Sequence, residues 1–318
     1  MTRWLLAGFV ALFSALASAQ GFPERPVRII VPLPPGGSPD TIARTLAQGL
    51  QGVWPHPVVV ENRTGGSQNI GADAVAKSAP DGHTWLLAPD NVFSVNAHIA
   101  KQPFDPFADL APVTLLARIQ FLLVVHPDVP AKSVQELIAH AKAKPGELNF
   151  GSSGIGSPQF LGGTLLQQMS GTRMNHVPYK GAAPAVADLL AGRIQIWVGA
   201  ANSLLPHIKA DKLRVLGTAA GQRFSVLPDT PTIAEAGLPG YALYPWLGMF
   251  VPAKTPPDIV ARINAEIARI LNGPDVKARL VPQGMDIATG SPEELARVIR
   301  EDDARWGKVI RDAGIKPE

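Results

Sequence analysis

Short apolar runs alternate with stretches of helical periodicity along most of this 318-residue chain. The run at 28–31 is β-branched and bounded by prolines, which predicts a strand, and Ile42, Leu46 and Leu50 then recur at helical spacing. The same criteria predict strands at 58–60, 84–88, 122–125, 174–179, 194–198, 213–217 and 247–252, and helices at 72–79, 134–144, 160–169, 257–271 and 292–313. This alternation favours an α/β fold with a parallel sheet, in which ligands lie at the carboxyl ends of the strands.

A loop rich in proline and glycine separates the first predicted strand from its helix, in the sequence RIIVPLPPGGSPD at 28–40. Ser38 is the predicted N-cap of the helix and Pro39 its first residue. Gly36 and Gly37 have no Cβ, so the backbone there is able to adopt positive φ and to approach a ligand closely. Because the helix N-terminus also offers unpaired N–H groups, the loop predicts an anion site.

The same arrangement recurs at 148–160, LNFGSSGIGSPQF, where glycines again precede a serine and a proline, Ser157 and Pro158. By contrast, Ser291 and Pro292 have no such loop before them and predict only a helix start with a capping box. The two anion loops stand about half a chain apart. If each belongs to its own domain, they would face one another across a cleft and hold the two ends of a small dianion.

Several polar and aromatic residues near these loops have two interpretations. The loop at 89–94 follows a predicted strand and is either a second wall of the site or a polar turn. Tyr179 is expected to line the cleft, because its ring packs while its hydroxyl donates. We interpret Lys180 as a solvated lysine rather than a cation for the ligand, Trp246 as a core residue, and Asp40 as a charge that complements the helix dipole.

The first 19 residues predict a secretory signal peptide. Arg3 is followed by an apolar run at 4–16 and by a small-residue cleavage site at 17–19, so the mature protein would begin at Gln20 and be periplasmic. The apolar run is too short to span a bilayer. The chain contains no cysteine, and its 29 basic and 26 acidic residues are interspersed, which gives no basic patch for nucleic acid.

Motifs for catalysis and metal binding are missing from the sequence. The segment at 151–155 lacks the last glycine of a hydrolase elbow, and the segment at 154–159 lacks the last glycine of a dinucleotide-binding fingerprint. No Walker lysine follows a glycine loop, and the seven histidines stand too far apart for a paired metal motif on one helix. We therefore expect no cofactor, no metal and no enzymatic activity.

Four segments together resemble one family: PPGGSPDTIAR at 34–44, the stretch from VVVENRTGGSQNIG onward at 58–88, FGSSGIGSPQFLGG at 150–163 and VPYKGAAPAVADLLAG at 177–192. They resemble the Bug-type solute receptors of tripartite tricarboxylate transporters. The resemblance implies a type II periplasmic binding protein fold, with two α/β domains and a ligand cleft between them. By the family pattern the signal peptide covers 1–19, the first domain 20–118 and 245–318, and the second domain 119–244.

The resemblance also implies a set of ligand-binding residues. The two anion loops would hold the ligand carboxylates, the loop after 84–88 would form a wall, and polar residues at two strand ends would complete the site: Pro35, Gly36, Gly37, Ser38, Ser152, Ser153, Gly156, Ser157, Asp90, Asn91, Ser94, Tyr179 and Asn202. Asp90 stands where the family commonly has a small hydroxyl residue, and Ala201 where it often has aspartate. If Asp90 faces the ligand it would favour amino acids or hydroxylated acids over simple diacids, whereas if it caps its own loop it has no such effect.

We therefore predict a monomeric receptor that binds a small organic carboxylate and presents it to integral-membrane permease subunits. A secreted enzyme acting on a small acid is the alternative, and an exported sensor differs only in its partner. Turnover assays separate the first two, and partner capture separates the third. The ligand remains open among aliphatic diacids, aromatic acids, nicotinate-like acids and amino acids, because a backbone loop recognises a carboxylate whatever carries it.

Overall fold

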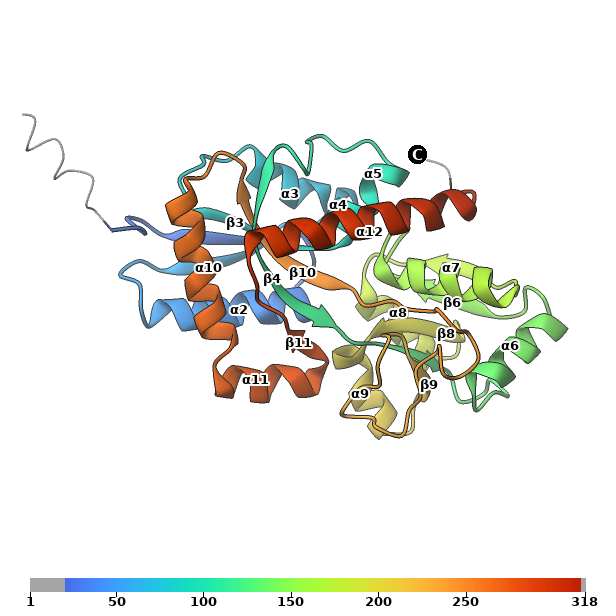
Figure 1. Cartoon of the computed structure of the whole chain (residues 1–318). Coiled ribbons are helices and arrows are strands. Elements are labelled where there is room, and N and C mark those ends of the chain that lie inside the picture. Colours follow the sequence, from blue (N-terminus) through green and yellow to red (C-terminus); the bar gives the residue numbers. More distant parts are fainter. Residues whose placement is uncertain (1–20, 316–318) are drawn as a thin grey trace, which may run out of the picture.

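A computed structural model describes residues 21–315, and these form two α/β domains built on separate sheets (Figure 1). The predicted signal peptide lies outside the described residues. Sheet 1 has the strand order β11-β4-β10-β3-β1-β2, and sheet 2 has the order β7-β6-β8-β5-β9. The predicted two-domain α/β fold is therefore confirmed.

The first domain carries sheet 1 and the helices around it. Its strands are β1 (Val27–Val31), β2 (Val58–Asn62), β3 (Thr84–Pro89), β4 (Leu110–Ile119), β10 (Trp246–Pro252) and β11 (Met285–Ile287). Its helices are α2 (Ser38–Gln51), η2 (Gly66–Gln68), α3 (Asn69–Ala76), α4 (Asn91–Ser94), α5 (Asn96–Ile99), α10 (Pro257–Leu271), α11 (Pro274–Leu280), η3 (Val281–Gln283) and α12 (Pro292–Asp312).

The second domain carries sheet 2 between four helices. Its strands are β5 (Phe121–Val125), β6 (Asn149–Ser152), β7 (Asn175–Pro178), β8 (Ile196–Ala200) and β9 (Arg214–Thr218). Its helices are α6 (Val134–Ala143), α7 (Pro158–Ser170), α8 (Ala182–Leu190) and α9 (Ala201–Lys209). The predicted strand at 194–198 is shifted toward the carboxyl end, because all of Ile196–Ala200 pairs in register with β5.

Both sheets are mixed, so the prediction of a parallel sheet is only partly correct. The β1–β2, β1–β3, β6–β7 and β6–β8 pairs are parallel. Strand β10 is antiparallel to β3 and β4, and β5 is antiparallel to β8 and β9. Strands β5 and β10 are the first strands that the chain forms after crossing into a domain. Their antiparallel direction therefore follows from the crossovers and not from a local βαβ unit.

The chain crosses between the sheets at two adjacent places. Only Gln120 separates β4 from β5, and the return segment ends at Pro245, just before β10. The two crossovers touch, since the Ile119 amide donates to the Pro245 carbonyl oxygen at 2.7 Å. The boundaries expected at 118/119 and 244/245 lie next to these crossovers and remain a prediction.

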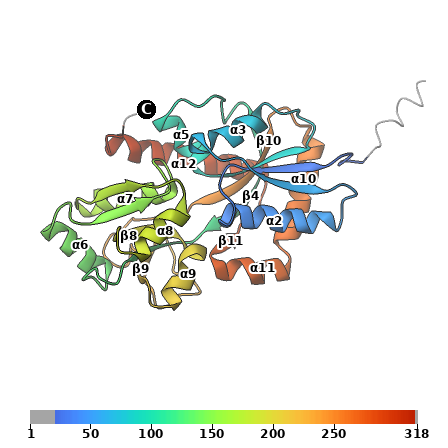
Figure 2. The same cartoon turned by 180° about the vertical axis from the view of Figure 1, so that it is seen from behind.

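Helix α12 extends from sheet 1 toward the second domain and ends beside α7 (Figures 1 and 2). Its middle is anchored to the first domain, where the Trp246 indole donates to Asp302 at 2.6 Å and His98 lies 2.8 Å from Asp303. Farther along, the Gln168 amide of α7 donates to the Val309 carbonyl oxygen at 3.4 Å. The last helix thus contacts both domains.

Apolar side chains fill the space between each sheet and its helices. Trp246 is fully buried, and Phe93 stacks on Phe250 with ring centroids 4.1 Å apart. The expectation that Trp246 belongs to the core is confirmed. This packing fixes α4 against the sheet, and α4 carries part of the candidate site.

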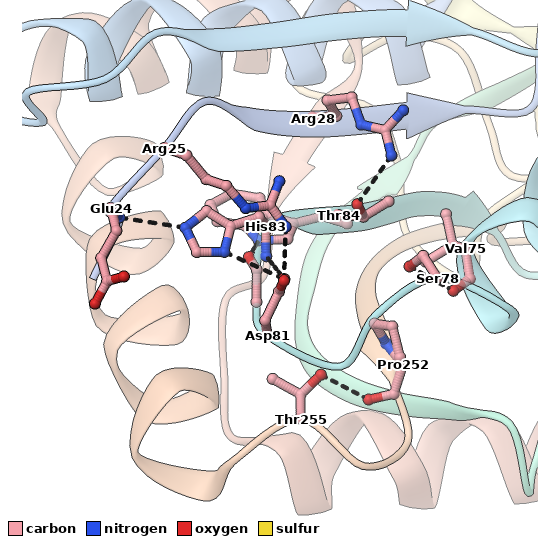
Figure 3. A network of polar contacts seen from close by, with 12 residues as sticks. Glu24, Arg25, Arg28, Val75, Ser78, Asp81, His83, Thr84, Pro252 and Thr255 are labelled. Carbon is pink, nitrogen blue, oxygen red and sulfur yellow. Dashed lines mark hydrogen bonds and ion pairs between the residues drawn. The ribbon is translucent and has the colours of Figure 1, made fainter. Parts of the chain in front are cut away.

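Polar contacts hold the amino ends of β1 and β3 together, at the end of sheet 1 away from the candidate site (Figure 3). Asp81 accepts from Arg25 at 2.6 Å and from the His83 amide at 3.0 Å, while the Glu24 amide donates to the His83 ring at 3.3 Å. Burial alone would raise the pKa of Asp81, but these hydrogen bonds outweigh it and hold the pKa below its ordinary value. The register that aligns the carboxyl ends of these strands is thereby fixed.

Candidate functional site

The first anion loop connects β1 to α2 and differs from its prediction by one residue. Gly37, not Ser38, is the N-cap, because its carbonyl oxygen accepts both the amide and the hydroxyl of Thr41. Gly36 has φ of 91°, which favours glycine, whereas Gly37 has an ordinary φ of −84°. The hydroxyl of Ser38 is buried and has no hydrogen-bond partner among the described residues.

Asp40 organises this loop, a role that its sequence position alone did not suggest. Its Oδ2 accepts from the Gly36 amide at 3.1 Å and from Arg44 Nε at 2.9 Å, and its Oδ1 accepts from Asn62 at 3.1 Å. Burial would raise the pKa of Asp40, but hydrogen bonds from Arg44, Gly36 and Asn62 outweigh it, so the pKa lies below its ordinary value. The side chain therefore acts as an ionised clamp as well as a partner for the helix dipole. The only local signal is an arginine four residues later.

The second anion loop connects β6 to α7, and here the predicted serine cap is confirmed. Ser157 Oγ accepts from the Phe160 amide at 3.3 Å and donates to the Gly154 carbonyl oxygen at 2.7 Å. Ser152 Oγ accepts from the Gly154 amide at 3.1 Å and lies 2.6 Å from His176 Nε2. Burial lowers the pKa of His176, which favours its neutral form. Both hydroxyls thus shape the loop, and no local sequence pattern indicated the contact of Ser152 with His176.

Backbone N–H groups in both loops are free of protein partners. Within residues 21–315, the amides of Gly37 and Ser38 in the first loop make no hydrogen bond. The amides of Ser153, Ile155 and Gly156 in the second loop also have none. Free N–H groups at the N-terminus of a helix attract anions, so each loop retains the chemistry predicted from its sequence.

The two loops approach the other domain at the interdomain boundary. A Cβ placed on Gly156 would lie 2.4 Å from Ile99 Cδ1 and 3.4 Å from Val95 Cγ1, so this glycine of the second domain packs directly on α5 of the first. A Cβ on Gly181, at the start of α8, would lie 3.9 Å from Pro34 Cγ in the first loop. The structure therefore brings the two loops to one boundary, where α8 faces the start of α2 (Figure 2).

The wall segment after β3 is a short helix rather than an open loop. Asp90 is its N-cap, with Oδ1 accepting from the Asn91 amide at 2.8 Å, and Ser94 Oγ donates to the Asp90 carbonyl oxygen at 2.9 Å. Asp90 and Asn91 are almost completely buried. Of the two expected orientations, the structure shows the capping one, so Asp90 gives no support to selectivity for amino or hydroxy acids.

Asp90→Asn should reduce the pH dependence of stability. Burial, with a further contribution from Asp302, raises the pKa of Asp90 from 3.8 to about 8. Because the folded state then binds the proton more tightly than the unfolded state, the parent's unfolding free energy should fall as the pH rises between these two values, by at most about 1.4 kcal/mol per pH unit. Asparagine keeps an acceptor for the cap and does not titrate. Urea unfolding at acidic and at mildly alkaline pH measures this, and identical pH profiles for parent and variant would contradict it.

Tyr179, Lys180 and Asn202 of the second domain differ in burial and in hydrogen bonding. Tyr179 is half-buried and its hydroxyl donates to Asp188 at 2.8 Å, so it is already engaged within its own domain, and burial raises its pKa to about 12. Lys180 is exposed, which agrees with a solvated lysine. Asn202 is half-buried in the first turn of α9, and its side chain makes no hydrogen bond with the described residues.

Residues 21–315 contain no group of three or more histidine, aspartate or glutamate side chains placed to hold a metal ion. No helix in this part is both long and apolar enough to cross a membrane.

Two α/β domains are joined by paired crossovers, and a glycine loop of each domain lies against the other domain. This arrangement defines a two-domain periplasmic binding protein fold. The chain belongs to the tripartite tricarboxylate transporter family receptors, whose family pattern matches residues 42–315. This is a family of binding proteins rather than enzymes. The predicted resemblance to Bug-type receptors is thereby confirmed.

Individual relatives match over almost their whole length. Protein BugT from Bordetella pertussis is 36% identical over 324 residues, covering 99% of each chain. The R. palustris protein Rpa4515, solved with adipate, has a TM-score of 0.89 at 35% identity, covering 94% of this chain and 100% of that one. MatC from Rhodopseudomonas palustris, solved with bound malate, has a TM-score of 0.84 at 31% identity, covering 91% of this chain and 100% of that one.

Proposed function

We propose that this receptor captures a small organic carboxylate between its domains and delivers it, as a monomer, to the permease subunits of a tripartite tricarboxylate-type transporter. The proposal is supported mainly by two anion loops, one from each domain, that each have free backbone N–H groups and each lie against the opposite domain. Adipate and malate in the relatives are both dicarboxylates, which suits a site with two anion loops.

The ligand would be held mainly by backbone donors. In this proposal one carboxylate binds at the first loop and the other at the second, with the wall helix and two strand-end residues around them: Pro35, Gly36, Gly37, Ser38, Ser152, Ser153, Gly156, Ser157, Asp90, Asn91, Ser94, Tyr179 and Asn202. Hydrogen bonds to a charged group contribute roughly 1.5–3 kcal/mol each. Two or three at each end would offset the cost of ordering the ligand and leave an affinity of about 1 μM.

The proposed place of action is the periplasm, after removal of residues 1–19. The family consists of periplasmic receptors, and the three-part pattern at the start of the sequence supports export. An intact mass that corresponds to a chain beginning at Gln20 would support this, and a longer mass in the soluble fraction would contradict it.

A thermal-shift screen tests the function. We expect at least one of succinate, malate, glutarate, glutamate, adipate, benzoate and nicotinate to raise the melting temperature. A ligand at 100 times its Kd adds about 2.7 kcal/mol, which corresponds to a shift of roughly 5–10 °C. The diamide of the best diacid is the matched control and should give no shift, since it carries no anion. An equal shift with the diamide, or turnover of the acid, would contradict the proposal.

A further inference from the structure

The side chain of Asn91 is buried but only half satisfied. Asn91 is 1% exposed, and its Nδ2 donates to Asn96 Oδ1 at 3.3 Å. Its Oδ1 is also buried and has no hydrogen-bond partner among the described residues. A buried acceptor without a partner is costly, so a donor from a water or a ligand at this oxygen would be favourable.

The hydrogen-bond network fixes which end of the amide is free. Asn96 Nδ2 donates to the carbonyl oxygen of Ser67 at 2.7 Å, and a backbone carbonyl only accepts. The Oδ1 of Asn96 must therefore face Asn91, and the Nδ2 of Asn91 must donate to it. A reversed Asn91 amide would bring two oxygens together.

A second contact keeps Asn96 from turning over. Its Nδ2 also donates to Asn69 Oδ1 at 3.2 Å, and the same oxygen accepts from Gln102 Nε2 at 3.1 Å. Gln102 is fixed in turn, because its Nε2 donates to the Val92 carbonyl oxygen at 3.0 Å. The amides of Asn69, Asn96 and Asn91 thus have one consistent orientation, set at both ends by backbone carbonyls.

The free oxygen lies in the wall segment of the proposed site. Asn91 begins α4 directly after β3, and β3 pairs with β1, which leads into the first anion loop. The next helix, α5, carries Ile99, which packs on Gly156 of the second loop. The Asn91 amide therefore stands in the segment that connects the contacts of both loops.

We propose that Asn91 presents a hydrogen-bond acceptor to the ligand, that Asn96 is the residue that positions it, and that the receptor consequently prefers carboxylates bearing a hydroxyl or ammonium donor. This rests on the proposed function of the same site. A site built to bind a donor discriminates strongly against the analogue that lacks it, because its own acceptor is then left unpaired.

Calorimetric titration of matched ligands tests the preference in the unmodified protein. The pairs are malate and succinate, 2-hydroxyglutarate and glutarate, and 2-hydroxyadipate and adipate, with the corresponding 2-amino acids as a third series. For the chain length that binds, we expect the member with a donor to bind at least 10-fold more tightly. Equal affinities within the pair would overturn the inference while leaving the receptor function intact, since an internal water would then satisfy Asn91. Binding of no carboxylate at all would overturn both.

Variants assign the preference to these residues. Asn91→Leu removes the acceptor, and Asn96→Ala frees the Asn91 amide to turn over, so both should reduce the affinity ratio within the pair to less than about threefold. Asn264→Ala is the matched control, because the Asn264 amide donates only to the carbonyl oxygens of Val113 and Gly290. It should lower stability without changing the ratio. A ratio that survives in both test variants would overturn the assignment, and the ratio in the parent remains decisive if either variant fails to fold.

Discussion

Gly156→Ala is expected to weaken carboxylate binding by roughly 10- to 100-fold while each domain still folds. The new methyl group would lie 2.4 Å from Ile99 Cδ1, in the other domain, and φ at this position is 78°. Overpacking of this kind costs about 1–3 kcal/mol, which corresponds to the stated range of affinity. Because this contact joins the two domains, the cost falls on the arrangement in which the second loop packs against α5 of the first domain.

Gly171→Ala is the matched control for backbone strain. Gly171 ends the same helix, α7, with φ of 63°, and a Cβ there has no neighbour within 4 Å. It should reduce stability by about 1–2 kcal/mol with little change in affinity. Adding Ile99→Ala to Gly156→Ala should recover much of the lost affinity. Calorimetric titration measures all three, and an equal loss in the Gly171 variant, or no recovery in the double variant, would show that the interdomain contact is not the cause.

Asp40→Asn is expected to lower the unfolding free energy by about 2–3 kcal/mol and the ligand affinity by tenfold or more. Gly36, Arg44 and Asn62 all donate to this carboxylate, and an asparagine would direct an NH₂ group at one of them. The loop would then lose the hydrogen bonds that hold its conformation beside the free amides of Gly37 and Ser38. The pKa of Asp40 lies below its unfolded value of 3.8, so its contribution is present above that pH and is lost as the pH falls through the folded pKa.

Asp73→Asn provides a comparison on the surface of the same domain. Asp73 pairs with Lys77 one turn along α3 and is partly exposed. Such a pair contributes about 0–1 kcal/mol, so its loss should hardly change the melting temperature or the affinity. Chemical unfolding and calorimetric titration measure both variants. If the Asp40 variant is as stable and binds as tightly as the Asp73 variant, Asp40 does not hold the first loop in its binding conformation.

Local signals in the sequence were sufficient to locate both glycine loops and the helices that follow them. Glycines followed by Ser-Pro indicate a loop and a helix start wherever they stand, and Ser157 caps α7 as predicted. The N-cap of α2 lies one residue earlier than predicted, because the Thr41 amide and hydroxyl both donate to the Gly37 carbonyl oxygen. A threonine three residues after Ser38 does not indicate in the sequence that Gly37 will be the cap. The sequence therefore predicts where a helix starts to within about one residue. It does not predict which backbone N–H groups of the loop remain without a partner.

The sequence pattern did not predict contacts between segments that are distant along the chain. Strand β4 contains Pro112, and it was not predicted because its pairing with β10 and β11 is set far along the chain. The Asn96 amide bonds Ser67, 29 residues earlier, and no periodicity links the two. Asp90 had two possible orientations in the sequence, and burial against the core decided between them in the folded chain.

Amide hydrogen exchange with and without the carboxylate that gives the largest melting shift tests whether the ligand binds between the two loops. If one ligand bridges two domains through backbone N–H groups, peptides covering 36–38 and peptides covering 153–156 should both exchange more slowly when it is bound. At a ligand concentration near the Kd of the parent, Gly156→Ala should reduce the protection of both segments together. Protection of one loop alone, or of segments away from the interdomain boundary, would contradict binding between the two loops.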